Sequence, residues 1–84
     1  MHIVTEKNLV IGRKVIRGKD WDFPEYQDDY GKSIGMIMSP PDLPESDGEV
    51  WVDVLWLNNR HNNRYRIKLL HDLYYCKKEI IGIL

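Results

Sequence analysis

The segment from Val50 to Leu57 constrains the fold most, because its side chains alternate with a period of two. One face of this segment carries Val50, Val52, Val54 and Trp56. The other face carries Trp51, Asp53, Leu55 and Leu57. This alternation is typical of a half-buried β-strand. No part of the chain shows a sustained helical stripe of apolar residues, so the fold must be built from strands.

Four shorter runs predict further strands. They are the β-branched run around Val15 that ends at Gly18, and the segments 34–38, 63–69 and 73–75. In the segment 63–69, Tyr65, Ile67 and Leu69 share one face, and Arg64, Arg66 and Lys68 share the other. A proline pair at 40–41 ends the second strand.

The connections between these runs favour a small β-barrel. Residues 39–48 hold three prolines and an Asp-Gly pair, which predicts an irregular exposed loop. Residues 58–63 are rich in asparagine and predict a hairpin turn. Several short strands with almost no helix indicate an all-β, five-stranded barrel. We expect an N-terminal arm at 1–8, the barrel at 9–75 and a tail at 76–84 that packs on the barrel.

Composition narrows the class of function. The chain has 84 residues, 43% hydrophobic and 30% charged, so we expect one small folded domain. A net charge of -1 argues against nucleic acid as a partner. No apolar run approaches the ~20 residues that a membrane-spanning helix needs. The single cysteine and the lack of a signal-peptide pattern favour the cytoplasm, with the nucleus also possible.

The sequence gives no support for catalysis, a metal site or a cofactor. Cys76 and His71 are five residues apart without a glycine-elbow or oxyanion-hole motif, so we predict no enzyme activity. The carboxylates between Asp20 and Asp29 lack the spacing of a calcium loop. The histidines have no cysteine partners at zinc spacing.

Two groups of residues carry a more specific signal. The run GRKVIRGKDW matches the pattern G-x-x-V-x-R-G-x-D-W at Gly12, Val15, Arg17, Gly18, Asp20 and Trp21. Later matches are Gln27-Asp28, Gly35 with Ile37, the run from Val52 to Trp56, Tyr65-Arg66 and Asp72-Leu73. Together these motifs resemble the MIB/HERC domain of Mind bomb and HERC-type ubiquitin ligases.

The resemblance implies a fold and a role. It implies a small barrel of the Src-homology-3 type within a large ubiquitin ligase, where such domains help to recruit substrate in Mind bomb. We therefore expect a non-catalytic, monomeric module that binds a protein or peptide segment, either of a substrate or of the ligase itself. Two alternatives stay open: a reader of methylated lysine, and a structural module that packs against neighbouring domains.

Six residues are candidates for peptide binding. Trp51 lies on the strand face opposite Trp56, which favours an exposed anchor. Phe23, Tyr26 and Tyr30 follow Trp21 in a loop where aromatic rings supply rigid contact area. Arg64 and Arg66 line one strand face and would attract an acidic peptide. A methyl-lysine reader would instead require Trp51, Tyr26 and Tyr30 to form a cage.

The remaining matched residues are expected to have structural roles. Trp21 and Trp56 are large enough to fill the core of so small a domain. Asp20 and Asp28 are expected to accept turn N–H groups or to pair with Arg17 and Arg66.

Overall fold

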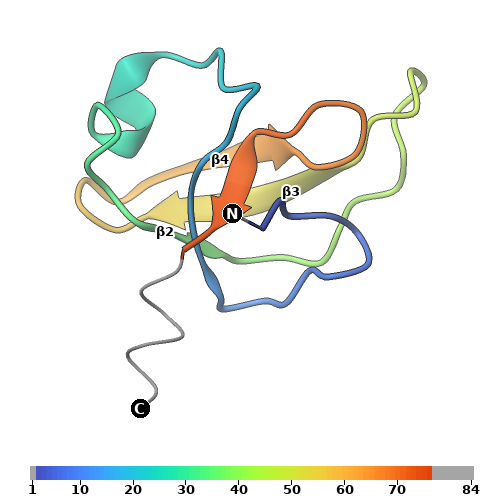
Figure 1. Cartoon of the computed structure of the whole chain (residues 1–84), viewed down its shortest axis with the longest axis horizontal. Coiled ribbons are helices and arrows are strands. Elements are labelled where there is room, and N and C mark those ends of the chain that lie inside the picture. The colour runs from blue at the N-terminus through green and yellow to red at the C-terminus, as the bar shows by residue number, and fades with distance from the viewer. Residues whose placement is uncertain (1, 77–84) are drawn as a thin grey trace.

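The computed structural model describes residues 2–76 and consists of strands with one short 3-10 turn (Figure 1). The elements are β1 (Lys14–Arg17), η1 (Glu25–Asp28), β2 (Gly35–Ile37), β3 (Trp51–Trp56), β4 (His61–Arg66) and β5 (Leu73–Tyr75). All five strands join one antiparallel sheet in the order β4-β3-β2-β1-β5. The prediction of an all-β, five-stranded domain is confirmed, whereas the 3-10 turn was not foreseen.

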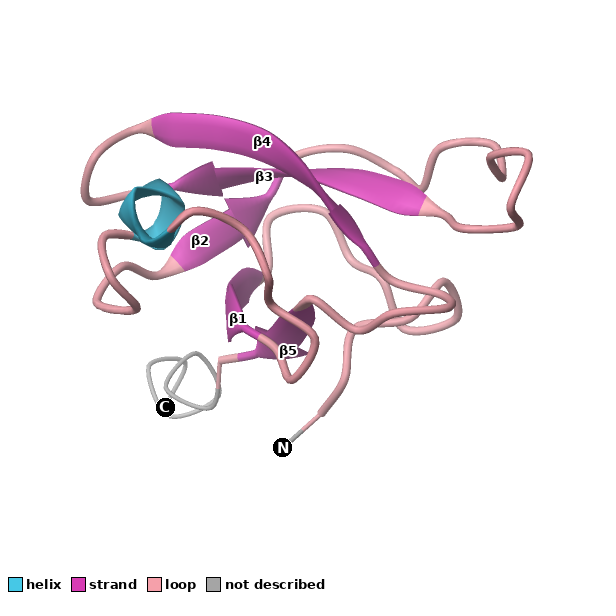
Figure 2. Ribbon diagram, turned by 90° about the horizontal axis from the view of Figure 1, so that it is seen from above, coloured by secondary structure: helices cyan, strands magenta, loops and turns pink. Residues whose placement is uncertain are grey.

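The sheet is strongly curved, so that it folds over its own core. Figure 2 shows β2, β3 and β4 on one side, and β1 with β5 on the other. Among the described strands, β4 and β5 have no ladder between them, so the sheet is not closed into a continuous barrel. A single backbone bond joins the ends of these strands, from Asp72 N–H to the Arg66 carbonyl at 3.1 Å.

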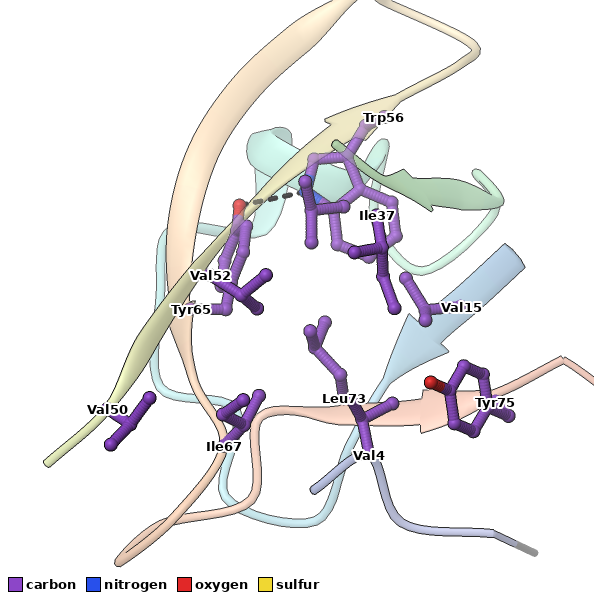
Figure 3. Packing of buried hydrophobic residues seen from close by; sticks show 11 residues of the cluster. Val4, Val15, Ile37, Val50, Val52, Trp56, Tyr65, Ile67, Leu73 and Tyr75 are labelled. Atoms are coloured by element: carbon purple, nitrogen blue, oxygen red, sulfur yellow. Dashed lines mark hydrogen bonds between the residues drawn. The ribbon is translucent and has the colours of Figure 1, made fainter. Parts of the chain in front are cut away.

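The core lies between these two parts of the sheet, as Figure 3 shows. The alternation of β3 is confirmed, because Val52, Val54 and Trp56 are fully buried while Trp51 lies on the opposite, half-buried face. Burying an aliphatic side chain of this size contributes about 1.5–3 kcal/mol. Since the core holds few such residues, each of them matters for stability.

The segment expected as an N-terminal arm also contributes to this core. Val4 is fully buried, and Ile3 bridges to Tyr74 beside β5. The Val4 N–H donates to the Leu73 carbonyl at 3.2 Å, and the Tyr75 N–H donates to the His2 carbonyl at 2.8 Å. Residues 2–4 therefore cover the outer edge of β5, which would otherwise expose unpaired backbone groups.

The strand predicted over 63–69 starts and ends earlier, at His61 and Arg66. Tyr65 and Ile67 are buried as expected, but Leu69 is 56% exposed. The cause is the carboxylate of Glu49, which accepts the N–H groups of residues 68, 69 and 70 at 2.9–3.1 Å. These bonds curl the chain away from the sheet, so the alternation of β4 does not continue to Leu69.

The buried Glu49 carboxylate is expected to make the free energy of unfolding depend on pH in the acidic range. Burial alone would raise the pKa of Glu49, but the bonds from four backbone N–H groups, those of Val50 and of residues 68–70, hold it below the usual 4.5. A lowered folded-state pKa stabilises the fold above about pH 4.5, and this stabilisation is lost as the pH falls through the folded-state value. We expect Glu49→Gln to lower the free energy of unfolding at pH 7 and to flatten its decline on acidification.

The measurement is chemical denaturation between pH 7 and pH 3. Glu45→Gln in the same loop is the matched control, because Glu45 is exposed. If both variants follow the wild-type pH dependence, the Glu49 carboxylate does not organise this turn.

The predicted tail starts at a buried residue. Cys76 is buried and donates its N–H to the Lys14 carbonyl at 2.9 Å. The remainder of the predicted tail, residues 77–84, lies outside the described residues. Within residues 2–76, no helix has the length and apolar character needed to cross a bilayer.

Candidate functional site

Residues that carry the family resemblance meet in three dimensions, and the first such contact is a partly buried ion pair. Arg17 at the end of β1 donates two bonds to Asp28 in η1, from Nε to Oδ2 at 2.7 Å and from Nη2 to Oδ1 at 2.6 Å. Asp28 is almost fully buried and also accepts the Gly31 N–H at 3.1 Å. The hydrogen bonds to Asp28 raise the pKa of Arg17. This pair anchors η1 to β1.

A second set of contacts joins the same turn to the core. The indole Nε1–H of Trp56 donates to the Tyr65 hydroxyl at 2.8 Å, and that hydroxyl donates to Gln27 Oε1 at 2.6 Å. Burial raises the pKa of Tyr65 to about 12. Trp21 stacks on the Tyr65 ring with centroids 5.1 Å apart. Trp56 is buried as predicted, whereas Trp21 is half-buried and packs against the core.

The hydroxyl of Tyr65 is expected to contribute to the stability of the domain in addition to the packing of its ring. Tyr65→Phe leaves the Trp56 indole N–H and the Gln27 carbonyl without this partner. An unsatisfied buried polar group costs about 1–3 kcal/mol. We therefore expect a loss of that size in the free energy of unfolding, measured by denaturant titration. Tyr26→Phe is the control because Tyr26 is exposed; equal losses would show that the Tyr65 hydroxyl is dispensable.

A third set of contacts fixes the turn before β5. Arg66 donates to both carboxylate oxygens of the fully buried Asp72, from Nε at 2.7 Å and from Nη2 at 2.8 Å. Asp72 also accepts the backbone N–H of Arg66 at 2.7 Å. Burial raises the pKa of Asp72, and the bonds from Arg66 act against that rise. Asp20 accepts the N–H of His71 at 2.6 Å and offers only its carbonyl to Arg66.

Two of the matched glycines, Gly12 and Gly18, are needed for different reasons. Gly12 has a φ of +91°, in the left-handed region that favours glycine. Gly18 lies so close to the start of β5 that a Cβ atom there would be 2.5 Å from the His71 carbonyl oxygen. The pattern around residues 12–21 therefore places a turn before β1, and after β1 a close contact between Gly18 and the backbone that leads into β5.

Four of the six candidate binding residues lie together, since Trp51, Arg64 and Arg66 share the outer face of β3 and β4, and Phe23 reaches Arg66 from the connection after β1. Arg66 stacks over the Phe23 ring at 5.0 Å and approaches the Trp51 ring at 5.9 Å. Arg64 reaches the Trp51 ring from the same strand at 5.7 Å. We call the area formed by Phe23, Arg66, Trp51, Arg64 and the carboxylates of Asp22 and Asp42 the Trp51 surface.

Carboxylates neutralise both arginines of the Trp51 surface. Arg64 pairs with Asp42, and Arg66 pairs with Asp22 at 2.7 Å as well as with Asp72. The Arg66 side chain is only 14% exposed. Asp53 faces Arg64 across the strands, so two arginines stand among four aspartates. The expectation that this stripe would attract an acidic peptide is therefore not supported by its electrostatics.

The other two candidates, Tyr26 and Tyr30, lie around η1. Tyr26 contacts His61 edge to face, with ring centroids 5.5 Å apart. His61 pairs with Trp56 at the turn end of the β3–β4 hairpin. Trp51 lies at the opposite end of that hairpin, about 17 Å away at roughly 3.3 Å per strand residue. Both tyrosines are exposed, and Tyr30 has a φ of +56°. The aromatic cage required of a methyl-lysine reader is not assembled.

The chain is similar to a segment of a ubiquitin ligase. That protein is the E3 ubiquitin-protein ligase hecd-1 of Caenorhabditis elegans, which is 43% identical over 53 residues. The match covers 63% of this chain, and the chain spans 2% of the length of that ligase. No protein-family profile matches the sequence, and no solved structure matches it.

Sequence reasoning missed three acidic residues that shape this region. Asp22 and Asp42 pair with the arginines of the Trp51 surface, and Glu49 holds the turn after β4. Asp22 directly follows the matched residue Trp21, but nothing in its spacing points to Arg66. Asp42 and Glu49 lie in or next to a segment that its prolines predicted to be an irregular loop. That pattern indicated no bonding partner for either carboxylate.

Proposed function

We propose that this chain is a non-catalytic recognition module of a ubiquitin ligase, of the MIB/HERC type. The observation that carries the proposal is the assembly of the matched residues. Arg17 with Asp28, Tyr65 with Trp56 and Gln27, and Arg66 with Asp72 are contacts between separate parts of the pattern. Bonds between residues from separate parts of a pattern, made within one fold, are what a shared domain requires.

The strand order supports the Src-homology-3-like part of the proposal. Four strands follow one another as a meander, and β5 returns to pair with β1. This order brings both ends of the sheet around one core, even though β4 and β5 are joined only at Asp72 and Arg66. Similarity to a segment of hecd-1 supports the link to ubiquitin ligases.

The Trp51 surface is the proposed binding site for a protein or peptide segment. A half-buried tryptophan beside arginine side chains is the composition that binding hot spots favour, where single residues contribute about 2 kcal/mol or more. The site includes Phe23, whose ring packs against Tyr65 with centroids 4.9 Å apart and is therefore held rigidly. Rigid aromatic area lowers the entropic cost of binding.

Selection of displayed peptides against the folded domain tests this function. The selection is repeated on a Trp51→Ala, Arg64→Ala variant whose fold has been checked by its melting transition. Peptides that bind the wild type and lose at least tenfold in affinity for the variant support the proposal. Tyr30→Ala serves as the control, because Tyr30 is an exposed aromatic residue that lies away from the Trp51 surface.

A folded domain that selects no peptide contradicts the recognition function. That result favours the structural alternative, in which the domain packs against other parts of a longer chain. Exposed apolar side chains at Val10, Ile11 and Met38 would then be candidates for such a contact.

A further inference from the structure

We propose that the segment recognised at the Trp51 surface carries a lysine or arginine side chain. This inference rests on the proposed recognition function and names the chemistry of its ligand. It starts from the charges, since a binding surface attracts side chains of the opposite sign and rejects those of its own sign.

The positive charges of this surface are already satisfied by the protein itself. Arg66 is nearly buried between Asp72 and Asp22, and Arg64 bonds to Asp42. Arg66 is largely shielded from an acidic ligand, and an anion that approaches Arg64 meets the carboxylates of Asp42 and Asp53 beside it. Such a contact between like charges disfavours an acidic ligand.

The Asp22 carboxylate is far more accessible than the arginine with which it pairs. The side chain of Asp22 is 69% exposed against 14% for Arg66, and Asp42 is 44% exposed beside an Arg64 of similar exposure. They come from two different connections, the one after β1 and the one before β3, and both reach the arginines that border the Trp51 ring. Carboxylates bonded to the arginines that border an aromatic ring offer ion pairing to an incoming cation, and the ring adds cation–π attraction.

Apolar contact area accompanies these charges. The Asp42 N–H donates to the Trp51 carbonyl at 2.9 Å, which fixes the loop beside the ring. The next residue, Leu43, is 87% exposed. Leu43 and the Trp51 ring can therefore cover the aliphatic stem of a lysine or arginine whose charged end reaches Asp42 or Asp22.

The Asp42 carboxylate is accessible to a cationic side chain of the ligand. The Arg64 side chain is 46% exposed, and the pair that it forms with Asp42 is a surface pair, which contributes only ~0–1 kcal/mol. The bond from Arg64 goes to Oδ2 of Asp42, so a ligand guanidinium or ammonium can approach Oδ1 of the same carboxylate without displacing Arg64. Arg66 stays in place, because Asp72 beneath it is fully buried and holds it with two bonds.

The test is selection from a library of random nonapeptides on the wild-type domain and on three variants. Asp22→Asn and Asp42→Asn each remove one carboxylate charge, and Glu45→Gln removes an exposed charge from the same loop as Asp42. We expect lysine and arginine to be enriched among peptides bound by the wild type. We also expect their affinity to fall about fivefold or more for each aspartate variant, with less than a twofold change for Glu45→Gln.

The outcomes separate this inference from the proposed function. Peptides that bind at the Trp51 surface without enrichment of lysine and arginine, or with enrichment of aspartate and glutamate, overturn the inference and leave the recognition function standing. An equal loss of affinity in Glu45→Gln and in the aspartate variants also overturns it, because the attraction would then be a general charge effect. A folded domain that selects no peptide at all overturns both proposals.

Discussion

Arg66→Ala is expected to destabilise the domain by about 3–5 kcal/mol, the cost of removing one partner from a buried ion pair. The variant leaves the carboxylate of Asp72 fully buried without its two bonds from the guanidinium. It also removes the contact with Asp22 and the stacking on Phe23. A domain of this size has a total stability of about 5–15 kcal/mol or less, so the variant would be close to unfolding at room temperature.

The free energy of unfolding from urea titration measures this effect. Arg64→Ala is the matched control on the same strand, since its pair with Asp42 is exposed and is worth only about 0–1 kcal/mol. Lys32→Ala is a second control at an exposed site. Arg66→Lys keeps the charge but cannot form the two parallel bonds, so it should fall between the wild type and Arg66→Ala. A loss in Arg66→Ala no larger than that in Lys32→Ala would show that the pair with Asp72 does not hold the fold.

Gly18→Ala is expected to have the second large effect. A Cβ atom at this position would lie 2.5 Å from the His71 carbonyl oxygen, 2.6 Å from the Leu73 nitrogen and 2.7 Å from the Asp72 carbonyl carbon. All three are backbone atoms of the segment that enters β5, so no side-chain rotation relieves the overlap. Overpacking typically costs about 1–3 kcal/mol and sometimes more, and we expect the upper end here.

The effect of Gly18→Ala is measured by thermal and urea unfolding. Gly12→Ala separates crowding from backbone strain, because Gly12 has a positive φ but no atom within 4 Å of its Cβ position. We expect that variant to lose only about 1 kcal/mol, the cost of a left-handed conformation. If Gly18→Ala is as stable as Gly12→Ala, then β1 and the start of β5 can separate without loss.

The sequence predicted the strands well where one face of a strand is buried along its full length. The alternation of β3 placed Val52, Val54 and Trp56 in the core and Trp51 outside, because strand geometry sends successive side chains to opposite faces. The short runs at β1 and β5 were located by their β-branched and aromatic residues. The end of β4 was predicted wrongly, since the pattern carried no sign of the carboxylate of Glu49 that curls residues 68–70.

The sequence predicted the residues of the candidate site better than it predicted the charges that surround them. Trp51, Arg64 and Arg66 meet because the sheet brings together residues on one face of neighbouring strands, whereas Phe23 joins them from the connection after β1. The partners of the arginines were not predicted. Arg66 bonds to Asp22 across 44 residues of sequence, and Arg64 bonds to Asp42 across 22 residues. Only the folded chain brings these charges within reach of one another.

The sequence by itself determined the all-β class, the positions of the strands and the face of β3 that enters the core. These follow from local geometry, in which a period of two fixes which side chains share a face. The tertiary structure alone decided that residues 2–4 complete the sheet edge, that Glu49 ends the run after β4, and that the arginines around Trp51 are neutralised. Each of these depends on which distant segments pack together, and short-range periodicity holds no information about such contacts.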